Sequence, residues 1–231
     1  MDQIRRIEIA VAILFIMATV LFSVGQAAHL SILNDPDYLT LATASSGRIV
    51  AGTLTEFMGV LAIPLTAVFL FPLLKRHSES LARSYVTIRT IEAIPLLLVE
   101  GLILAILALG QSPGGGDPSV DWQTVGATIQ ALREAVFLMS VGLVFPIGCV
   151  LLNSMLLKTR LVPGWLAVWG IGAGVVLLSG SALSLFGLLE DVPPAALEAA
   201  IAGPVAIQEM VFAGWLLAKG FDPGALKRLR T

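Results

Sequence analysis

The sequence predicts an all-α fold: a six-helix transmembrane bundle that forms a single membrane domain over residues 1–231. Apolar residues make up 57% of the chain and charged residues only 13%, with a mean hydropathy of +0.91, whereas about one quarter of a soluble domain is charged. The apolar residues form six continuous runs, and each is close to the roughly 20 residues that a helix needs to cross the hydrocarbon core. Basic residues gather in alternate loops, as in multi-pass membrane proteins.

We expect the six spans at residues 7–28, 51–73, 86–109, 135–157, 164–188 and 199–218. Continuous runs argue against a membrane β-barrel, whose segments of about ten residues alternate between apolar and polar positions. The first run exceeds the about 7–15 apolar residues of a signal peptide, so we expect it to remain as a span.

The distribution of positive charge predicts the orientation of the bundle. Eleven of the fourteen lysines and arginines lie before span 1, between spans 2 and 3, between spans 4 and 5, or after span 6. The opposite loops carry mainly acidic residues. Loops rich in lysine and arginine stay on the cytoplasmic side, so both termini are expected to be cytoplasmic.

Composition excludes several classes of function. The net charge of −2 leaves no basic surface for nucleic acid. A single cysteine, Cys149, excludes disulfides within the chain and cysteine-rich metal sites. His29 and His77 fall outside the expected spans, so neither histidine-ligated haem nor a three-histidine zinc site is expected in the membrane. We therefore expect no cofactor, no metal and no catalytic residue, and we lean against an enzyme.

The candidate functional residues are the charged residues within or at the mouth of the spans: Glu56, Arg89, Glu92, Glu100, Arg133, Glu134 and Glu209. A charge at mid-bilayer costs about 2.5–3.5 kcal/mol even on a lenient insertion scale, and it usually faces a cavity or a partner. Arg89 and Glu92 have the i,i+3 spacing of a helix-surface pair. Glu56 and Glu100 have no basic residue at their own depth unless Arg133 turns inward. Glu100 is expected to converge with Glu209 near the midplane.

Three interpretations of these residues remain open. Protonatable glutamates near an arginine are typical of proton relays and proton-coupled carriers, so the favoured function is proton-coupled transport or permeation of a small solute. In the structural alternative, neutral glutamates hydrogen-bond between helices. In the third, Glu56, Glu100, Glu134 and Glu209 bind a metal, although no histidine joins them.

Span 5 is rich in small residues, among them Gly170, Gly174 and Ser181. Small residues let helices approach closely in lipid, and packing inside the bundle is their simplest role. The alternative function that they suggest is a non-catalytic accessory, sensor or assembly subunit, docked through span 5 to a membrane protein partner or to a second copy. Membrane lipids are the other expected partner. A lipid-acting enzyme is less favoured, because no nucleophile–base pair is visible.

A short internal repeat links two spans. Residues 93–100 in span 3 and 202–209 in span 6 both read A-x-P-[LV]-x-[LI]-x-E. The two spans run in opposite directions, so spans 1–3 and 4–6 would form inverted-topology halves, an architecture of transporters with a site near the midplane. No such match links spans 1 and 4 or spans 2 and 5.

Three motifs give the chain a resemblance to a known family. They are Y-x-x-x-R-x-x-E-A at residues 85–93, L-V-P-G-W-L at 161–166, and Glu209 followed by W-L-L-x-K-G at 215–220. In order and spacing the chain resembles a bacterial family of small membrane proteins known as a domain of unknown function. The resemblance implies six helices in a bacterial plasma (inner) membrane and directs attention to Arg89, Glu92 and Glu209. It implies no activity. Gly164 stands where the family typically has a basic residue.

Overall fold

The computed structural model describes residues 3–111 and 120–229, and all regular secondary structure in them is helical, which confirms the all-α class. Five helical stretches are long and apolar enough to cross a membrane, and they are Gln3–Leu33, Ser46–Leu74, Glu79–Gly110, Trp122–Thr159 and Gly164–Leu185. A shorter apolar helix covers Gly203–Ala218. Large apolar side chains such as Ile94 and Met139 remain more than half exposed, as expected for a surface that faces lipid.

The first half of the chain forms three long helices. The first consists of α1 (Gln3–Ile16), a π-helical segment η1 (Met17–Leu21) and α2 (Phe22–Leu33). A short helix, α3 (Tyr38–Ala44), leads into α4 (Ser46–Leu74), and α5 (Glu79–Gly110) follows. The Ser78 hydroxyl caps α5 by accepting a hydrogen bond from the backbone N–H of Leu81.

The second half begins with the longest helix, which consists of α6 (Trp122–Phe137), the π-helical segment η3 (Leu138–Val144) and α7 (Phe145–Thr159). The Asp121 carboxylate caps its start by accepting hydrogen bonds from two backbone N–H groups. Pro146, in the first turn of α7, has no N–H to donate to the preceding turn, and this loss favours the wider π-helical turn before it. Nothing in the sequence explains η1. α8 (Gly164–Leu185) follows.

The prediction of one continuous helix over residues 199–218 is wrong. The chain forms α9 (Pro194–Ile201) and α10 (Gly203–Ala218), which meet at Ala202. Pro204 lies in the first turn of α10, where its missing N–H costs nothing. The preceding Gly203 offers little helix propensity. The two residues together therefore break the helix.

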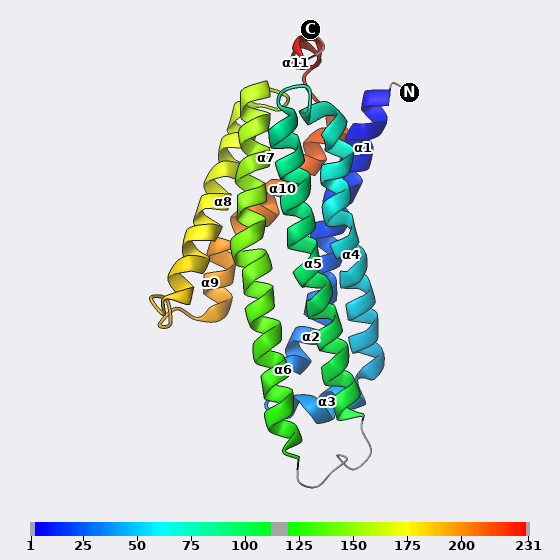
Figure 1. Cartoon of the computed structure of the whole chain (residues 1–231), viewed down its shortest axis with the longest axis vertical. Helices are drawn as coiled ribbons and strands as arrows, with labels where there is room; N and C mark the ends of the chain where they lie inside the picture. Colours follow the sequence, from blue (N-terminus) through cyan, green and yellow to red (C-terminus); the bar gives the residue numbers. More distant parts are fainter. Residues whose placement is uncertain (1–2, 112–119, 230–231) are drawn as a thin grey trace.

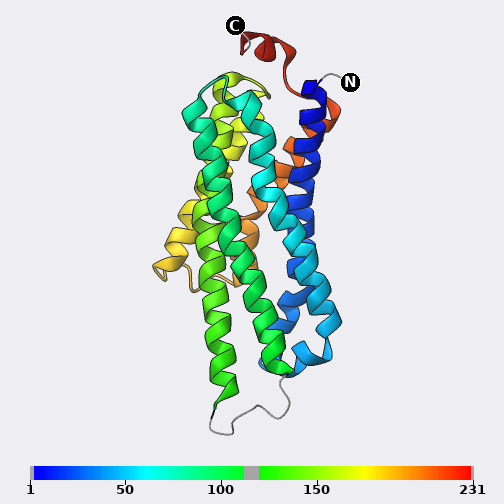
Figure 2. The same cartoon turned by 45° about the vertical axis from the view of Figure 1, so that its right-hand side comes forward.

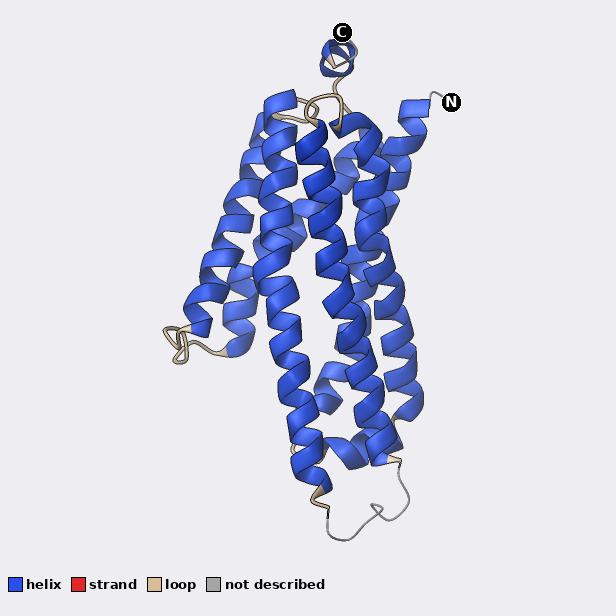
Figure 3. Cartoon of the chain, in the orientation of Figure 1, coloured by secondary structure: helices blue, strands red, loops and turns tan. Residues whose placement is uncertain are grey.

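The long helices close into a ring. Consecutive spans pack on one another, α1 also packs on α10, and α5 packs on η3 and α7. Both termini lie at one end of the molecule, here called the termini end, together with the α4–α5 and α7–α8 connections (Figure 1). The opposite end, here called the far end, carries α3 and the start of α6. Figures 2 and 3 show that α5 and α6 extend further toward the far end than α8 and α9 do.

The described residues form four apolar clusters in the interior, and three of them follow one another along its length. A layer at the termini end includes Phe15, Leu74, Met155 and Phe212. A layer at the far end consists of Ile32, Leu33, Tyr38, Ala42, Ile49, Val99, Ile103, Ile106 and Leu107. Between them lies the middle apolar layer, formed by Ala18, Val60, Ala62, Ile63, Ala93 and Leu96, with Phe22 and Phe137 packed against it.

The ends of the chain are joined by a contact here called the Glu8 clamp, formed by Arg5, Glu8, Gly220 and Phe221. The buried Glu8 carboxylate accepts a hydrogen bond of 2.8 Å from the backbone N–H of Phe221. Its other oxygen lies 3.1 Å from Arg5 Nη1, and Arg5 also donates to two carbonyls at the end of α10. A cation at a helix C-terminus satisfies carbonyls that have no partner within the helix. The clamp thus fastens α1 to the end of α10.

The small residues of span 5 are used inside the chain. A Cβ atom at Gly170 would lie 2.3 Å from the Asn153 side chain, and one at Gly174 would lie 2.9 Å from Val150. Ser181 is buried next to Gly142 of η3. These three small residues therefore set the close packing of α8 on α7 and η3.

Candidate functional site

A cluster of three ionisable side chains lies toward the far end of the bundle. His29 of α2, Glu56 of α4 and Glu100 of α5 are 1%, 1% and 4% exposed, and together they are called the His29 cluster. His29 Nε2 lies 2.7 Å from Glu56 Oε2. Gly25 permits this contact, since a Cβ atom there would lie 2.6 Å from Glu56 Cβ. The first two long helices therefore approach closely at this point.

The Glu100 carboxyl group faces Glu56, with which it interacts electrostatically. Within residues 3–111 and 120–229, neither Glu100 oxygen nor His29 Nδ1 has a hydrogen-bond partner. The His29 cluster thus places two carboxyl groups and an imidazole next to one another, out of contact with solvent.

This cluster corrects two expectations. His29 was expected outside the apolar spans, but the first helix runs to Leu33 and buries it. Glu56 was expected to lack a basic partner at its depth, and His29 supplies one. The error lies in the predicted end of span 1 at residue 28, one position before the histidine.

A second cluster of charges lies closer to the termini end. Arg89 Nη1 lies 3.0 Å from Glu92 Oε2, and both side chains are at most 4% exposed, which confirms the predicted i,i+3 pair. The guanidinium group also stacks over the Phe145 ring at 5.5 Å. Glu209 of α10 interacts electrostatically with Arg89. These three residues, Arg89, Glu92 and Glu209, are called the Arg89 cluster.

Glu209 also accepts a hydrogen bond from the first helix. Thr19, in η1, donates from its hydroxyl to Glu209 Oε2 at 2.9 Å. Glu209 and Arg89 border a small cavity of about 10 Å³, lined also by Tyr85, Asn153 and Gln208. A cavity of this size has room for roughly one water molecule. Arg89 therefore interacts with both the Glu92 and the Glu209 carboxylates, next to a small cavity with polar lining residues.

The two clusters are separated along the bundle. Glu92 and Glu100 are eight residues apart on α5, or about 12 Å at the rise of an α-helix. On α4 and α5 the middle apolar layer falls between the clusters, with Val60 after Glu56 on α4 and Leu96 between the two glutamates on α5. Such a layer resists the passage of water and ions.

The expected convergence of Glu100 with Glu209 is wrong. Glu100 faces Glu56, whereas Glu209 faces Thr19 and Arg89. The prediction rested only on the depth of each residue along its span, because both residues lie near the midplane on helices of opposite direction. The ring instead packs α10 on α1 and α8, and places α5 between α4 and the η3–α7 helix.

Arg133 and Glu134 belong to neither cluster. The Arg133 side chain is 6% exposed and lies 3.4 Å from the Glu134 carboxylate, which is 65% exposed. Hence Glu56, Glu100, Glu134 and Glu209 do not form the carboxylate metal site considered from the sequence. Among the residues that the structure describes, no group of three or more histidine, cysteine, aspartate or glutamate side chains is arranged to hold a metal ion.

Two hydroxyl groups that bond to Glu209 and Glu92 were not predicted from the sequence. Thr19 is the third residue of η1 and donates to Glu209 of α10. Ser140 is the third residue of η3 and donates to the backbone carbonyl of Glu92 on the third span, at 2.6 Å. Threonine and serine are common in membrane helices, so only the π-helical geometry distinguishes these two.

The comparisons with known proteins agree with the resemblance seen in the sequence. A comparison with curated proteins and with solved structures gives no match. Residues 10–220 match the sequence family described as Domain of unknown function (DUF4386). This match covers both clusters and ends at Gly220 of the Glu8 clamp. The chain, an all-helical protein with several apolar helices, therefore belongs to the DUF4386 family.

Proposed function

We propose that this protein is a proton-coupled permease for a small solute, with six membrane crossings in a bacterial inner membrane. The observation that carries the proposal is the pair of buried acidic clusters on either side of the middle apolar layer. Ionisable groups inside a membrane protein typically mark ion or proton pathways. Two proton-holding sites with a closed barrier between them are what alternate access requires.

The proposed orientation places the termini end in the cytoplasm. Arg5, Lys75, Arg76 and Lys158 lie at this end, in agreement with the positive-inside rule. The sixth crossing is α10, whose 16 residues would span about 24 Å. The preceding α9 supplies the remaining apolar length. An even number of crossings agrees with the two termini lying at one end (Figure 1).

In the proposed cycle the His29 cluster exchanges protons with the external side and the Arg89 cluster with the cytoplasm. A proton enters between Glu56 and Glu100, where His29 is the neighbouring base. The middle apolar layer blocks its further movement in the conformation described here. When the helices rearrange, the proton reaches Glu92 or Glu209, which compete for one arginine. The solute would cross during the same rearrangement.

Pseudo-symmetry of the ring supports this architecture. The first and fourth spans each contain a π-helical segment, and the third residue of each segment is a hydroxyl donor. Thr19 donates to the sixth span and Ser140 donates to the third span. Exchange of spans 1–3 with spans 4–6 relates the pairs of helices that these two hydrogen bonds join. π-Helical turns are frequent at functional sites.

The test is proton uptake into liposomes that contain the purified protein and an internal pH-sensitive dye. Under an inward proton gradient, wild-type protein should acidify the lumen faster than protein-free liposomes. The double variant Glu100→Gln/Glu209→Gln should abolish the difference. Glu134→Gln is the matched control, because Glu134 is an exposed glutamate outside both clusters. Its uptake should equal that of the wild type.

A second readout reports protonation without any need for the solute. Infrared difference spectra between high and low pH should contain a protonated carboxyl band that disappears in Glu100→Gln. Equal uptake by the double variant and the wild type would refute the proposal, as would wild-type uptake no faster than that of empty liposomes.

A further inference from the structure

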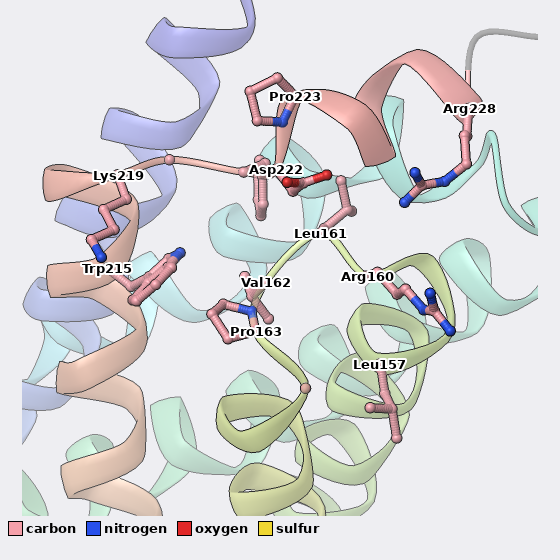
Figure 4. A pocket seen from close by; sticks show the side chains of 13 residues that line it. Leu157, Arg160, Leu161, Val162, Pro163, Trp215, Lys219, Asp222, Pro223 and Arg228 are labelled. Carbon is pink, nitrogen blue, oxygen red and sulfur yellow. The ribbon is translucent and has the colours of Figure 1, made fainter.

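A separate cavity lies at the termini end, between the α7–α8 connection and the segment that joins α10 to α11 (Pro223–Arg228). Its volume is about 520 Å³, and Figure 4 shows the residues that line it. The two segments are held together by a hydrogen bond of 2.9 Å from the backbone N–H of Asp222 to the carbonyl of Leu161. The cavity is therefore a formed feature between two connected segments.

The lining of this cavity is positively charged. Arg160, Lys219 and Arg228 contribute three positive charges and Asp222 one negative charge. Within the described residues, the Arg160 guanidinium group forms no hydrogen bond or ion pair. Arg160 also has a left-handed backbone, with φ of 56°, which is uncommon for a residue other than glycine. Arg160 therefore lines the cavity with a guanidinium group that no described residue engages.

Aromatic residues of the kind found at membrane surfaces line and flank the same cavity. Trp215 lines it, and the Lys219 ammonium group lies 4.6 Å from the centre of the Trp215 ring. Trp165 packs edge-on against Trp215 at 6.4 Å and is 55% exposed. Tryptophan is enriched at the level of the lipid headgroups. Figure 4 shows Arg160 and Arg228 toward one end of the cavity and Lys219 with Trp215 toward the other.

We propose that this cavity binds the phosphate of an anionic phospholipid headgroup, with Arg160 and Lys219 as its principal ligands. Arginine and lysine are the usual partners of phosphate, and basic pockets between membrane helices on the cytoplasmic side bind acidic headgroups. The acyl chains would leave along Trp215 and Trp165 into the bilayer. The occupant is a lipid rather than free phosphate, because the cavity opens at the aromatic belt. This site is independent of the proton-binding clusters.

The test is native mass spectrometry of the purified protein in a mild detergent, titrated with phosphatidylglycerol or phosphatidylcholine. Wild-type protein should retain phosphatidylglycerol at lower lipid concentrations than phosphatidylcholine. Each basic residue removed should weaken binding by about fivefold, which corresponds to ~1 kcal/mol. Arg160→Gln/Lys219→Gln should therefore lose most of the preference. Lys75→Gln/Arg76→Gln is the matched control, because it removes two exposed charges at the same end outside the cavity.

Each outcome is decisive for the proposal. Loss of the preference in the cavity variant alone supports the site. Equal losses in both double variants would show that only the total charge of this end matters, and would overturn it. Displacement of the lipid by inorganic phosphate would assign the cavity to a soluble anion. An absence of preference for phosphatidylglycerol in the wild type would also refute the inference. Size-exclusion chromatography of each variant verifies that it is folded.

Discussion

Replacement of Gly220 by alanine should weaken the Glu8 clamp by an amount that the structure determines. Gly220 has φ of 71°, a left-handed conformation that costs alanine about 1–2 kcal/mol. The new methyl group would lie 2.6 Å from Glu8 Oε2 and 2.8 Å from Oε1, so the carboxylate has to withdraw. It would then lose the hydrogen bond from Phe221, and a bond to a charged group contributes about 1.5–3 kcal/mol. The expected loss of stability is about 2.5–5 kcal/mol.

A double-mutant cycle separates the two contributions. The free energy of unfolding is measured for wild type, Gly220→Ala, Glu8→Ala and the double variant by reversible denaturation in mixed detergent micelles. In the Glu8→Ala background the alanine meets no carboxylate, so only the backbone cost of about 1–2 kcal/mol should remain. Strict additivity of the two single effects would refute the proposed contact, and a loss below about 0.5 kcal/mol for Gly220→Ala would refute the whole argument.

Three further changes test other parts of the structure. His29→Leu removes the only described hydrogen-bond partner of buried Glu56 and should cost about 1–3 kcal/mol; an unchanged melting temperature in detergent would show that the pair does not form. Gly170→Ala should lower the free energy of unfolding by about 1–3 kcal/mol, because the new methyl group overpacks against α7. Gly172→Ala is the control: a Cβ atom there has nothing within 4 Å, so the free energy of unfolding should stay unchanged or rise slightly. Equal effects of the two variants would contradict the assigned packing. Hydrogen bonds from the Thr124 hydroxyl and from backbone N–H groups lower the pKa of Asp121. The Asp121 cap is therefore complete above the usual pKa range of aspartate and is lost as pH falls through the lowered pKa. Over that fall in pH, amide exchange at the start of α6 should rise in the wild type, whereas Asp121→Ala should show the raised exchange at every pH.

The sequence predicted the all-α class and the approximate position of each apolar stretch, because continuous hydropathy is sufficient to identify membrane helices. It predicted the Arg89–Glu92 pair for a similar reason, since the two residues share one helix and its geometry is fixed. The break at Ala202 was missed because proline inside an apolar run is tolerated elsewhere in this chain. Pro64 and Pro95 lie inside α4 and α5 without ending them.

Contacts between helices were harder to predict than contacts within one helix. The positions of Glu100 and Glu209 along the helix axes predicted that they would lie near each other. Those positions say nothing about the order of the helices around the ring, and this order gives each residue a different partner. His29 was set aside because the predicted span ended one residue too early. Its pairing with Glu56 depends on the close approach of two helices at Gly25, and no hydropathy value reports such an approach.

The Glu8 clamp has a consequence for how the protein is made. Its carboxylate comes from α1 and its N–H donor from the segment after α10, which is synthesised 213 residues later. Until synthesis reaches Phe221, α1 has no final neighbour on one side, and Glu209 has not yet entered the bilayer to meet Arg89. Closure of the ring and completion of the Arg89 cluster are therefore late events, and a nascent chain stalled before α10 should be the form most exposed to membrane proteases.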